Sequence, residues 1–258
     1  MSSDSAPKSG DSYLASVSDL MIGMLFIFII MLMAFALNLR AAQATTDVQA
    51  QALHVENARL TETDAIRRQM LLEIQKSLRD QGIPVEVDLE NGILRLPEAL
   101  LFDSGSAQFR LDGQIAVERL RQALSTILPC YSSGAEAPLA CPSIRRGQLD
   151  SVFIEGHTDN VPVQTSEFKD NWDLSVARAR VTYDALLVGS DILPNLRNLR
   201  GQPLFSMAAY GDTRPVAPND SDENRKKNRR IDLRFIMAVP KAITTSDLAN
   251  PTQGLNGH

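Results

Sequence analysis

An unbroken apolar run near the N-terminus constrains this chain more than any other feature of its sequence. From Leu20 to Leu39 there is no charged residue. As a helix rising ~1.5 Å per residue, this run is ~30 Å long and matches the hydrocarbon core of a bilayer. We therefore predict a single transmembrane helix over residues 12–39, preceded by an N-terminal tail over residues 1–11.

A cleaved signal peptide is the alternative, because Ala42-Gln43-Ala44 resembles a small-residue cleavage site. The apolar region of a signal peptide is usually only ~7–15 residues long and follows a basic segment. Here the run is longer and Lys8 is the only base before it. We favour a retained span, and because Arg40 lies just after it, the flanking charges do not orient the helix.

Net charge and cysteine usage narrow the compartment and the partners. The formal net charge of −5 disfavours direct binding of nucleic acid, which requires a concentrated basic surface. Cys130 and Cys141 flank a polar stretch that a loop-closing disulfide can bridge, and a disulfide indicates an oxidising compartment. Two unpaired thiols are the alternative.

The rest of the chain divides into a stalk, a folded domain and a tail. Residues 40–80 carry apolar residues at helical spacings and predict a helical stalk, although residues 40–60 also fit a partly disordered linker. Residues 81–240 are the predicted folded domain. Residues 241–258 contain little to bury, and we expect disorder there.

The folded domain has the pattern of an α+β fold. Asn91-Gly92 separates two apolar segments, residues 85–89 and 93–96, and predicts a hairpin. Strands and helices then alternate before a final antiparallel strand. The expected helices cover residues 111–128 and 174–187, and the expected strands cover residues 149–155, 205–210 and 231–237.

Asp19 stands directly before the uninterrupted apolar run and has two interpretations. It is either an N-cap in the headgroup region or, if the helix starts at Ser12, an acid inside the span on one face with Ser12, Ser16 and Gly23. An ionisable side chain at membrane depth normally faces a bundle interior and marks an ion pathway. A single helix forms no channel, so ion transport requires partner helices.

Several ordered motifs between residues 85 and 238 resemble the OmpA C-terminal family. They are Phe102–Ala107, Ile154–Asn160, Asn171–Arg180, Gly211–Pro215 and Asn228–Ile231. The resemblance implies a periplasmic, peptidoglycan-binding domain of βαβαβ type with a mixed sheet. In that family, residues at the positions of Asp159 and Arg178 hold the diaminopimelate of the peptidoglycan stem peptide. Diaminopimelate presents an ammonium and a carboxylate together, which suits a carboxylate beside a guanidinium.

The resemblance also gives a set of expected binding residues. They are Thr158, Asp159, Asn171, Leu174, Ser175, Arg178, Asn228 and Arg229. An intramolecular salt bridge between Asp159 and Arg178 without a ligand is the alternative, and Asn228 and Arg229 also fit a solvated strand entry. His157 is expected to be structural, because no ligand spacing surrounds it. With no nucleophile and base pair evident, we expect neither an enzyme nor a cofactor.

A membrane aspartate, a stalk and an OmpA-like domain in this order resemble the B-type subunits of ion-driven stators, such as MotB of the flagellar motor. The resemblance implies a homodimer inside a pentamer of a MotA-like membrane subunit, with Asp19 carrying protons or sodium ions and the domain anchored to peptidoglycan. It also implies a bacterial inner-membrane protein whose N-terminal tail, residues 1–11, is cytoplasmic.

The sequence departs from the flagellar type in two features, and in both it resembles the ZorB subunits of the Zorya antiphage defence system. Flagellar members usually carry aromatic residues, often Trp, around the aspartate, whereas residues 16–26 contain no Trp, and the cysteine loop between Leu128 and Ser143 resembles an insertion. The implied membrane partner is then a ZorA-type subunit. A flagellar stator and a passive membrane-to-wall tether are the alternatives.

Overall fold

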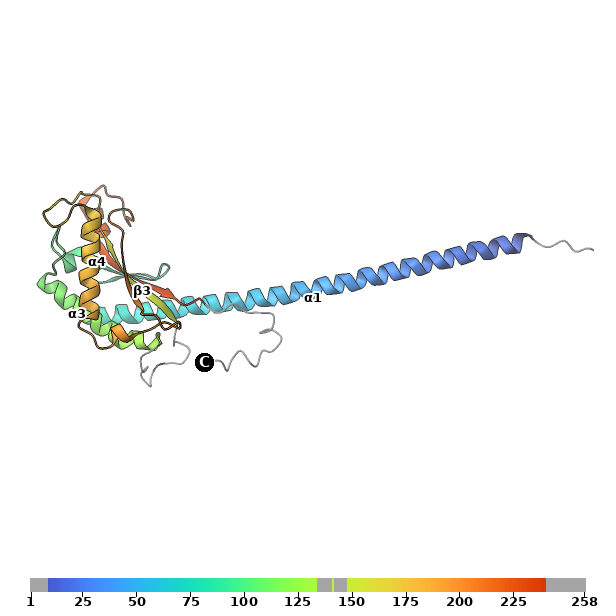
Figure 1. Ribbon diagram of the computed structural model, residues 1–258, viewed down its shortest axis with the longest axis horizontal. Coiled ribbons are helices and arrows are strands. Elements are labelled where there is room, and N and C mark those ends of the chain that lie inside the picture. Colours follow the sequence, from blue (N-terminus) through green and yellow to red (C-terminus); the bar gives the residue numbers. More distant parts are fainter. Residues whose placement is uncertain (1–8, 134–140, 142–147, 240–258) are drawn as a thin grey trace, which may run out of the picture. The chain divides into compact units, whose positions relative to one another are not determined.

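The computed structural model describes residues 9–133, 141 and 148–239 (Figure 1). The predicted tail over residues 241–258 and most of the predicted cytoplasmic tail lie outside this part of the chain. The elements, including two short 3-10 helices η1 and η3, are α1 Ser9–Asp80, β1 Glu86–Asp88, β2 Ile93–Pro97, α2 Glu98–Leu101, α3 Leu111–Ile127, η1 Leu128–Cys130, β3 Leu149–His157, α4 Asn171–Leu187, η3 Leu193–Asn195, β4 Phe205–Ala209, α5 Asp222–Asn228 and β5 Arg230–Met237.

A five-stranded mixed sheet organises the folded domain. The strand order is β1-β2-β5-β3-β4, in which β3 and β4 are parallel and the other neighbouring pairs are antiparallel. The parallel pair follows from the β3–α4–β4 crossover, because a helix must carry the chain back to the starting edge. The hairpin at Asn91-Gly92 is also present, with Gly92 at φ 71°, where glycine is favoured. The predicted α+β class with a mixed sheet is therefore confirmed.

The two faces of the sheet differ in chemistry, because side chains alternate along each strand. The apolar face packs into one hydrophobic core with α1, α3 and α4 and contributes Leu94, Leu96, Val152, Ile154, Ile231, Leu233 and Phe235. The opposite face carries Arg95, Glu155, His157, Arg230, Asp232 and Arg234. Figure 1 shows α3 and α4 beside the sheet that contains β3.

The chain forms two compact units, and the folded unit begins at Arg59. Within α1, one face from this point onward is buried in the domain core: Ile66, Met70, Leu71, Ile74 and Leu78. Their spacing of three and four residues places them on one side of the helix. Residues 59–80, predicted as part of the stalk, therefore pack into the domain as a core helix. Residues 40–58 are helical as well, which favours the helical interpretation of that segment over a disordered linker.

Adjacent leucines of α1 test this packing. Leu71 is fully buried, whereas the side chain of Leu72 is about half exposed. We expect Leu71→Ala to lower the free energy of unfolding by about 2–5 kcal/mol, because it leaves a cavity in the core. Leu72→Ala should cost less than about 1 kcal/mol. Urea-dependent pulse proteolysis of the purified chain measures both, and equal small effects would place this part of α1 outside the core.

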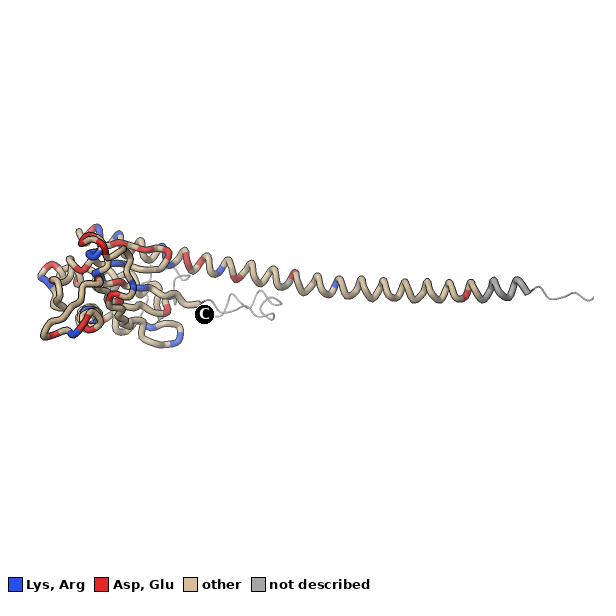
Figure 2. The backbone as a smooth tube through the Cα atoms, turned by 90° about the horizontal axis from the view of Figure 1, so that it is seen from above, with Lys and Arg blue, Asp and Glu red and all other residues tan. Residues whose placement is uncertain are grey.

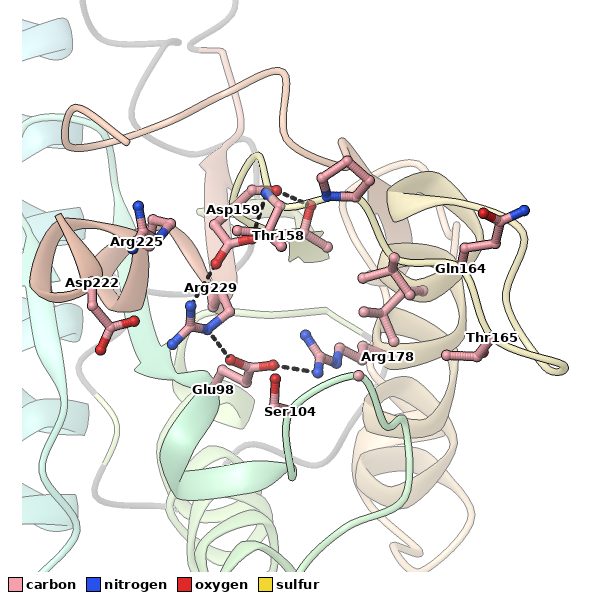
Figure 3. A pocket seen from close by; sticks show the side chains of 15 residues that line it. Glu98, Ser104, Thr158, Asp159, Gln164, Thr165, Arg178, Asp222, Arg225 and Arg229 are labelled. Carbon is pink, nitrogen blue, oxygen red and sulfur yellow. Dashed lines mark hydrogen bonds and ion pairs between the residues drawn. The ribbon is translucent and has the colours of Figure 1, made fainter. Parts of the chain in front are cut away.

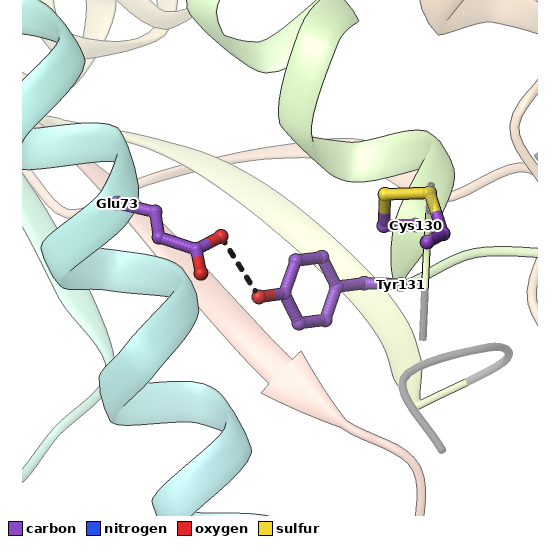
Figure 4. Close-up of a disulfide and its surroundings, with 4 residues drawn as sticks. Glu73, Cys130 and Tyr131 are labelled. Carbon is purple, nitrogen blue, oxygen red and sulfur yellow. Dashed lines mark hydrogen bonds between the residues drawn. A yellow bond between two sulfur atoms is a disulfide. The ribbon is translucent and has the colours of Figure 1, made fainter. Parts of the chain in front are cut away.

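A disulfide joins Cys130 and Cys141, with their Cα atoms 5.3 Å apart (Figure 4). The neighbouring Tyr131 is fully buried, and its hydroxyl donates a hydrogen bond of 3.1 Å to the Glu73 carboxylate on α1. The bridge therefore fixes the start of the cysteine loop directly beside a contact between that loop and α1.

Removing the bridge should destabilise the domain. We expect the Cys130→Ser and Cys141→Ser double variant to lose about 2–4 kcal/mol of unfolding free energy, because the closed loop restricts the unfolded chain. Reductant should lower the stability of the wild type but not that of the double variant. Urea unfolding with and without reductant measures both effects. Thiol labelling of the unreduced protein in isolated membranes provides a further check, and two free thiols there would rule out the bridge in cells.

Candidate functional site

A pocket of about 450 Å³ lies where β3 ends and α4 begins (Figure 3). Its walls come from four parts of the chain: the start of α2 with the loop after it, the loop after β3, the first turns of α4, and α5 with the residue that follows it. The lining residues are Glu98, Ser104, Gly105, Thr158, Asp159, Val161, Pro162, Val163, Gln164, Thr165, Leu174, Arg178, Asp222, Arg225 and Arg229.

The close approach of α4 to β3 positions the site. A Cβ atom on Gly156 would lie only 2.1 Å from the backbone carbonyl oxygen of Ser175, so only glycine permits this packing. Asp170 caps α4 by accepting a 2.9 Å hydrogen bond from the Asp173 amide. Because α4 starts at Asn171, Arg178 lies two turns along and faces the pocket.

Four charged side chains form an alternating chain along the pocket wall. The Arg229 guanidinium pairs with Asp159 through Nη1 and with Glu98 through Nε, both at 2.5 Å. The other oxygen of Glu98 pairs with Arg178 Nη2. Figure 3 shows the order Asp159, Arg229, Glu98, Arg178. Asp159 and Arg178 thus lie on the same pocket, but Glu98 and Arg229 connect them in place of a direct salt bridge.

Arg178 is buried, with only 1% of the residue exposed, and its guanidinium is held in place by several contacts. Its Nε donates to the backbone oxygen of Ser106 at 2.8 Å, its Nη2 donates to that of Asp103 at 3.3 Å, and the guanidinium lies 5.3 Å from the centre of the Phe102 ring. Burial lowers the pKa of Arg178, and the charge of Glu98 opposes that shift. Arginine stays protonated through such shifts, so the pocket presents a fixed cation.

Five of the eight expected binding residues line the pocket. They are Thr158, Asp159, Leu174, Arg178 and Arg229. The other three, Asn171, Ser175 and Asn228, are buried and do not line it.

These three residues bond to the backbone and shape the surrounding loops. Asn171 accepts from the Val163 amide at 3.0 Å and donates to the Asp159 carbonyl at 3.1 Å, so it fixes the loop after β3. The Ser175 hydroxyl accepts from the Gly211 amide at 3.1 Å. Asn228 likewise accepts two backbone amides of the loop before α5.

Sequence reasoning missed Glu98, Asp222 and Arg225. Glu98 lies two residues after the predicted strand over residues 93–96 and precedes the Phe102–Ala107 motif, but nothing local distinguishes it from a surface glutamate. Its partner Arg229 is 131 residues away in sequence, and only the pairing of β2 with β5 brings the two together.

A second buried group lies on the polar face of the sheet, where oxygen and nitrogen atoms of Glu155, His157 and Asp232 fall within 4.8 Å of one another. Three arginines already pair with the two acids: Arg95 and Arg230 with Asp232, and Arg234 with Glu155. Because the guanidinium groups outnumber the carboxylates, this cluster disfavours a divalent cation. Burial lowers the pKa of His157, which favours a neutral ring stacked 5.1 Å from Tyr210.

Glu155 makes the stability of this cluster depend on pH. Burial opposes its ionisation, but His157 and the hydrogen-bonded Arg234 outweigh that cost and lower the pKa of Glu155 from 4.5 to about 2. Because the folded pKa lies below the unfolded value, the charged form stabilises the fold above pH 4.5. This stabilisation disappears as the pH falls from about 4.5 towards about 2.

We therefore expect Glu155→Gln to be less stable than the wild type at pH 7 and to lose less stability on acidification between pH 4.5 and 2. Urea unfolding followed by the fluorescence of Trp172 measures this dependence. Glu223→Gln, on an exposed position of α5, should keep the wild-type slope. If the free energy of unfolding depends on pH in the same way for Glu155→Gln and the wild type, Glu155 does not contribute to the acid destabilisation.

Asp19 lies well inside α1, which begins at Ser9, so the helix start leaves no N-cap role for it. The Asp19 side chain is exposed, and the next charged residue is Arg40. Figure 2 shows the corresponding long stretch of α1 without acidic or basic residues. Of the described helices, α1 is the one long and apolar enough to cross a membrane, as judged by length and composition. The side chains of Ser12 and Ser16, predicted to share a face with Asp19, lie outside the described set.

Comparison with known proteins finds similar sequences and a similar fold. The OmpA family model matches residues 142–229. Motility protein B of Bacillus subtilis is 28% identical over 168 residues, which cover 64% of this chain and 54% of that protein. The uncharacterized protein YtxE of Bacillus subtilis is 24% identical over 256 residues, which cover 93% of this chain and 92% of that protein.

A solved structure of a putative MotB-like protein from Desulfovibrio vulgaris has the same fold, with a TM-score of 0.51 and 22% identity over 71% of this chain and 98% of that one. The fold and the comparisons together define the class: an OmpA-like domain joined to an apolar N-terminal helix. Among proteins of this kind, the chain is similar to Motility protein B of Bacillus subtilis. It spans about half the length of the Motility protein B of Bacillus subtilis.

Proposed function

We propose that this chain is the wall-anchored, ion-carrying subunit of a stator-type membrane motor that acts in antiphage defence of the Zorya kind. The observation that carries the proposal is a single carboxylate, Asp19, at the start of an uncharged apolar run on the same chain as an OmpA-like domain with a charged pocket. The other proposed roles follow from these two features.

The pocket suits the stem peptide of peptidoglycan. Its diaminopimelate ends in an ammonium and a carboxylate on one carbon, and the pocket offers Asp159 for the first and Arg178 for the second. Charge-assisted hydrogen bonds of this kind are stronger than neutral ones and favour a planar fork opposite a carboxylate. The fixed position of Arg178 favours ligand binding further, because the side chain loses little conformational entropy when the ligand binds.

The proposed ion pathway passes Asp19. An aspartate at membrane depth is costly unless it faces protein or water, so it requires partner helices. We propose two copies of this chain inside a pentamer of a MotA-like, ZorA-type subunit, with Asp19 taking up and releasing protons or sodium ions. The anchored domain would hold the unit still while ion flow drives rotation of the surrounding subunits.

A single-pass protein of the bacterial inner membrane fits the apolar helix and the MotB-like domain. The proposed orientation has a cytoplasmic N-terminus and a periplasmic domain, supported by the disulfide. The defence setting is supported by the absence of Trp in residues 16–26 and by the cysteine loop. A flagellar stator is the alternative setting, and a passive tether is the alternative in which Asp19 carries no ion.

Phage plating tests the proposal. Cells carrying the complete native operon should resist phage with the wild-type chain and lose protection with Asp19→Asn, because the amide cannot exchange a proton or bind a cation as a carboxylate does. Plating efficiency should rise to that of cells without the operon. Asp47→Asn, the same substitution at an exposed position beyond the span, should leave protection intact.

Expression and membrane levels of the variants must match for the comparison to hold. Full protection with Asp19→Asn would contradict ion carriage and favour the passive tether. Absence of protection even with the wild-type chain, against a broad phage panel, would contradict the defence setting and favour a flagellar-type stator.

A further inference from the structure

Resting on the wall-binding function proposed above, we infer that Glu98 determines the charge preference of the pocket. By balancing Arg178 and Arg229, it makes the pocket favour a zwitterionic amino-acid end over a ligand end that carries only a carboxylate. The family resemblance assigns ligand binding to Asp159 and Arg178. Glu98 is thus an additional residue that determines specificity.

Glu98 is fixed in place by both its backbone and its side chain. It is the first residue of α2, and its amide donates a 3.0 Å hydrogen bond to the backbone oxygen of Arg229. Its two carboxylate oxygens divide between Arg178 and Arg229. Since Pro97 pairs with Arg230 in the sheet, Glu98 stands opposite Arg229 because of strand register.

The charged wall of the pocket is electrically balanced. Asp159 and Glu98 contribute two negative charges, and Arg178 and Arg229 contribute two positive ones. Asp222 and Arg225, which also line the pocket, add one charge of each sign. A ligand end with one ammonium and one carboxylate satisfies both signs and leaves no charge unmatched, whereas a lone carboxylate does not.

Burial makes this balance matter. The side chains of Arg178, Glu98 and Asp159 are 2%, 7% and 7% exposed, and that of Arg229 is 20% exposed. Charges so far from bulk water are only weakly screened by salt. Removing the charge of Glu98 therefore leaves an excess positive charge that a carboxylate-only ligand compensates.

Three soluble peptides separate the charges of the ligand. Each begins L-Ala-γ-D-Glu and ends in meso-diaminopimelate with both groups, in 2-aminopimelate with only the distal carboxylate, or in L-lysine with only the distal ammonium. Calorimetry with the full chain in detergent gives the affinity for each. The wild type should bind the diaminopimelate peptide most tightly.

Glu98→Gln should shift the preference towards the carboxylate-only peptide, raising its affinity relative to the diaminopimelate peptide by about tenfold. Arg229→Gln is the reciprocal change and should shift the preference towards the lysine peptide. Glu223→Gln, at a side chain 85% exposed and 3.8 Å from Lys227, should leave the wild-type ratios unchanged.

The outcomes separate this inference from the function on which it rests. If the wild type binds the diaminopimelate peptide but both pocket variants keep its ratios while melting like the wild type, Glu98 has no such role and wall binding stands. If the wild type binds none of the peptides, wall binding and the role of Glu98 are both overturned. If Glu98→Gln unfolds, the ratio measured for Arg229→Gln decides.

Discussion

The close packing of α4 on β3 at Gly156 is the constraint on which the domain and its pocket depend. A side chain at this position would collide with the Ser175 carbonyl, so α4 would move away from the sheet. Arg178 stands one turn further along the same helix, and Asp159 follows the same strand. The distance between these two side chains across the pocket is therefore set by backbone contact, which is stiffer than any side-chain interaction in the site.

The pocket and the polar face of the sheet each contain a network of buried, paired charges. Burying a charge costs more than a single ion pair returns, unless further hydrogen bonds satisfy each group. In the pocket, Arg229 bridges two acids, and Arg178 also donates to two backbone oxygens. On the polar face of the sheet, Asp232 and Glu155 are matched by three arginines. The two networks differ in their surroundings: the second lies around the buried His157, whose pKa burial lowers, whereas the first lines the pocket.

The chain combines two environments that place opposite demands on an acid. Asp19 adjoins a run of α1 that contains no charged residue from Leu20 to Leu39, and there, as we propose, its carboxylate exchanges an ion. Asp159 instead pairs with the Arg229 guanidinium, which holds its carboxylate in one orientation. The C-terminal part of α1, from Arg59, belongs to the folded unit through Met70, Leu71 and Ile74. The stalk therefore ends before Arg59, and the rest of α1 is part of the folded domain.

Local pattern alone determined much of this protein. The apolar run over residues 20–39, the Asn91-Gly92 hairpin and the alternation of strands and helices are short-range signals, because helix and strand periodicity act over a few residues. The motifs around Asp159 and Arg178 likewise located the pocket through family resemblance. The burial of residues 66–78, the role of Glu98 and the inward turn of Asn171, Ser175 and Asn228 were decided only by the tertiary structure. Glu98 depends on Arg229, which is 131 residues away in sequence, and the pairing of β2 with β5 brings the two into contact. The partners of Asn171 and Asn228 lie only 8 to 12 residues away, but a local pattern does not fix which way these side chains turn, because that depends on how the loops pack.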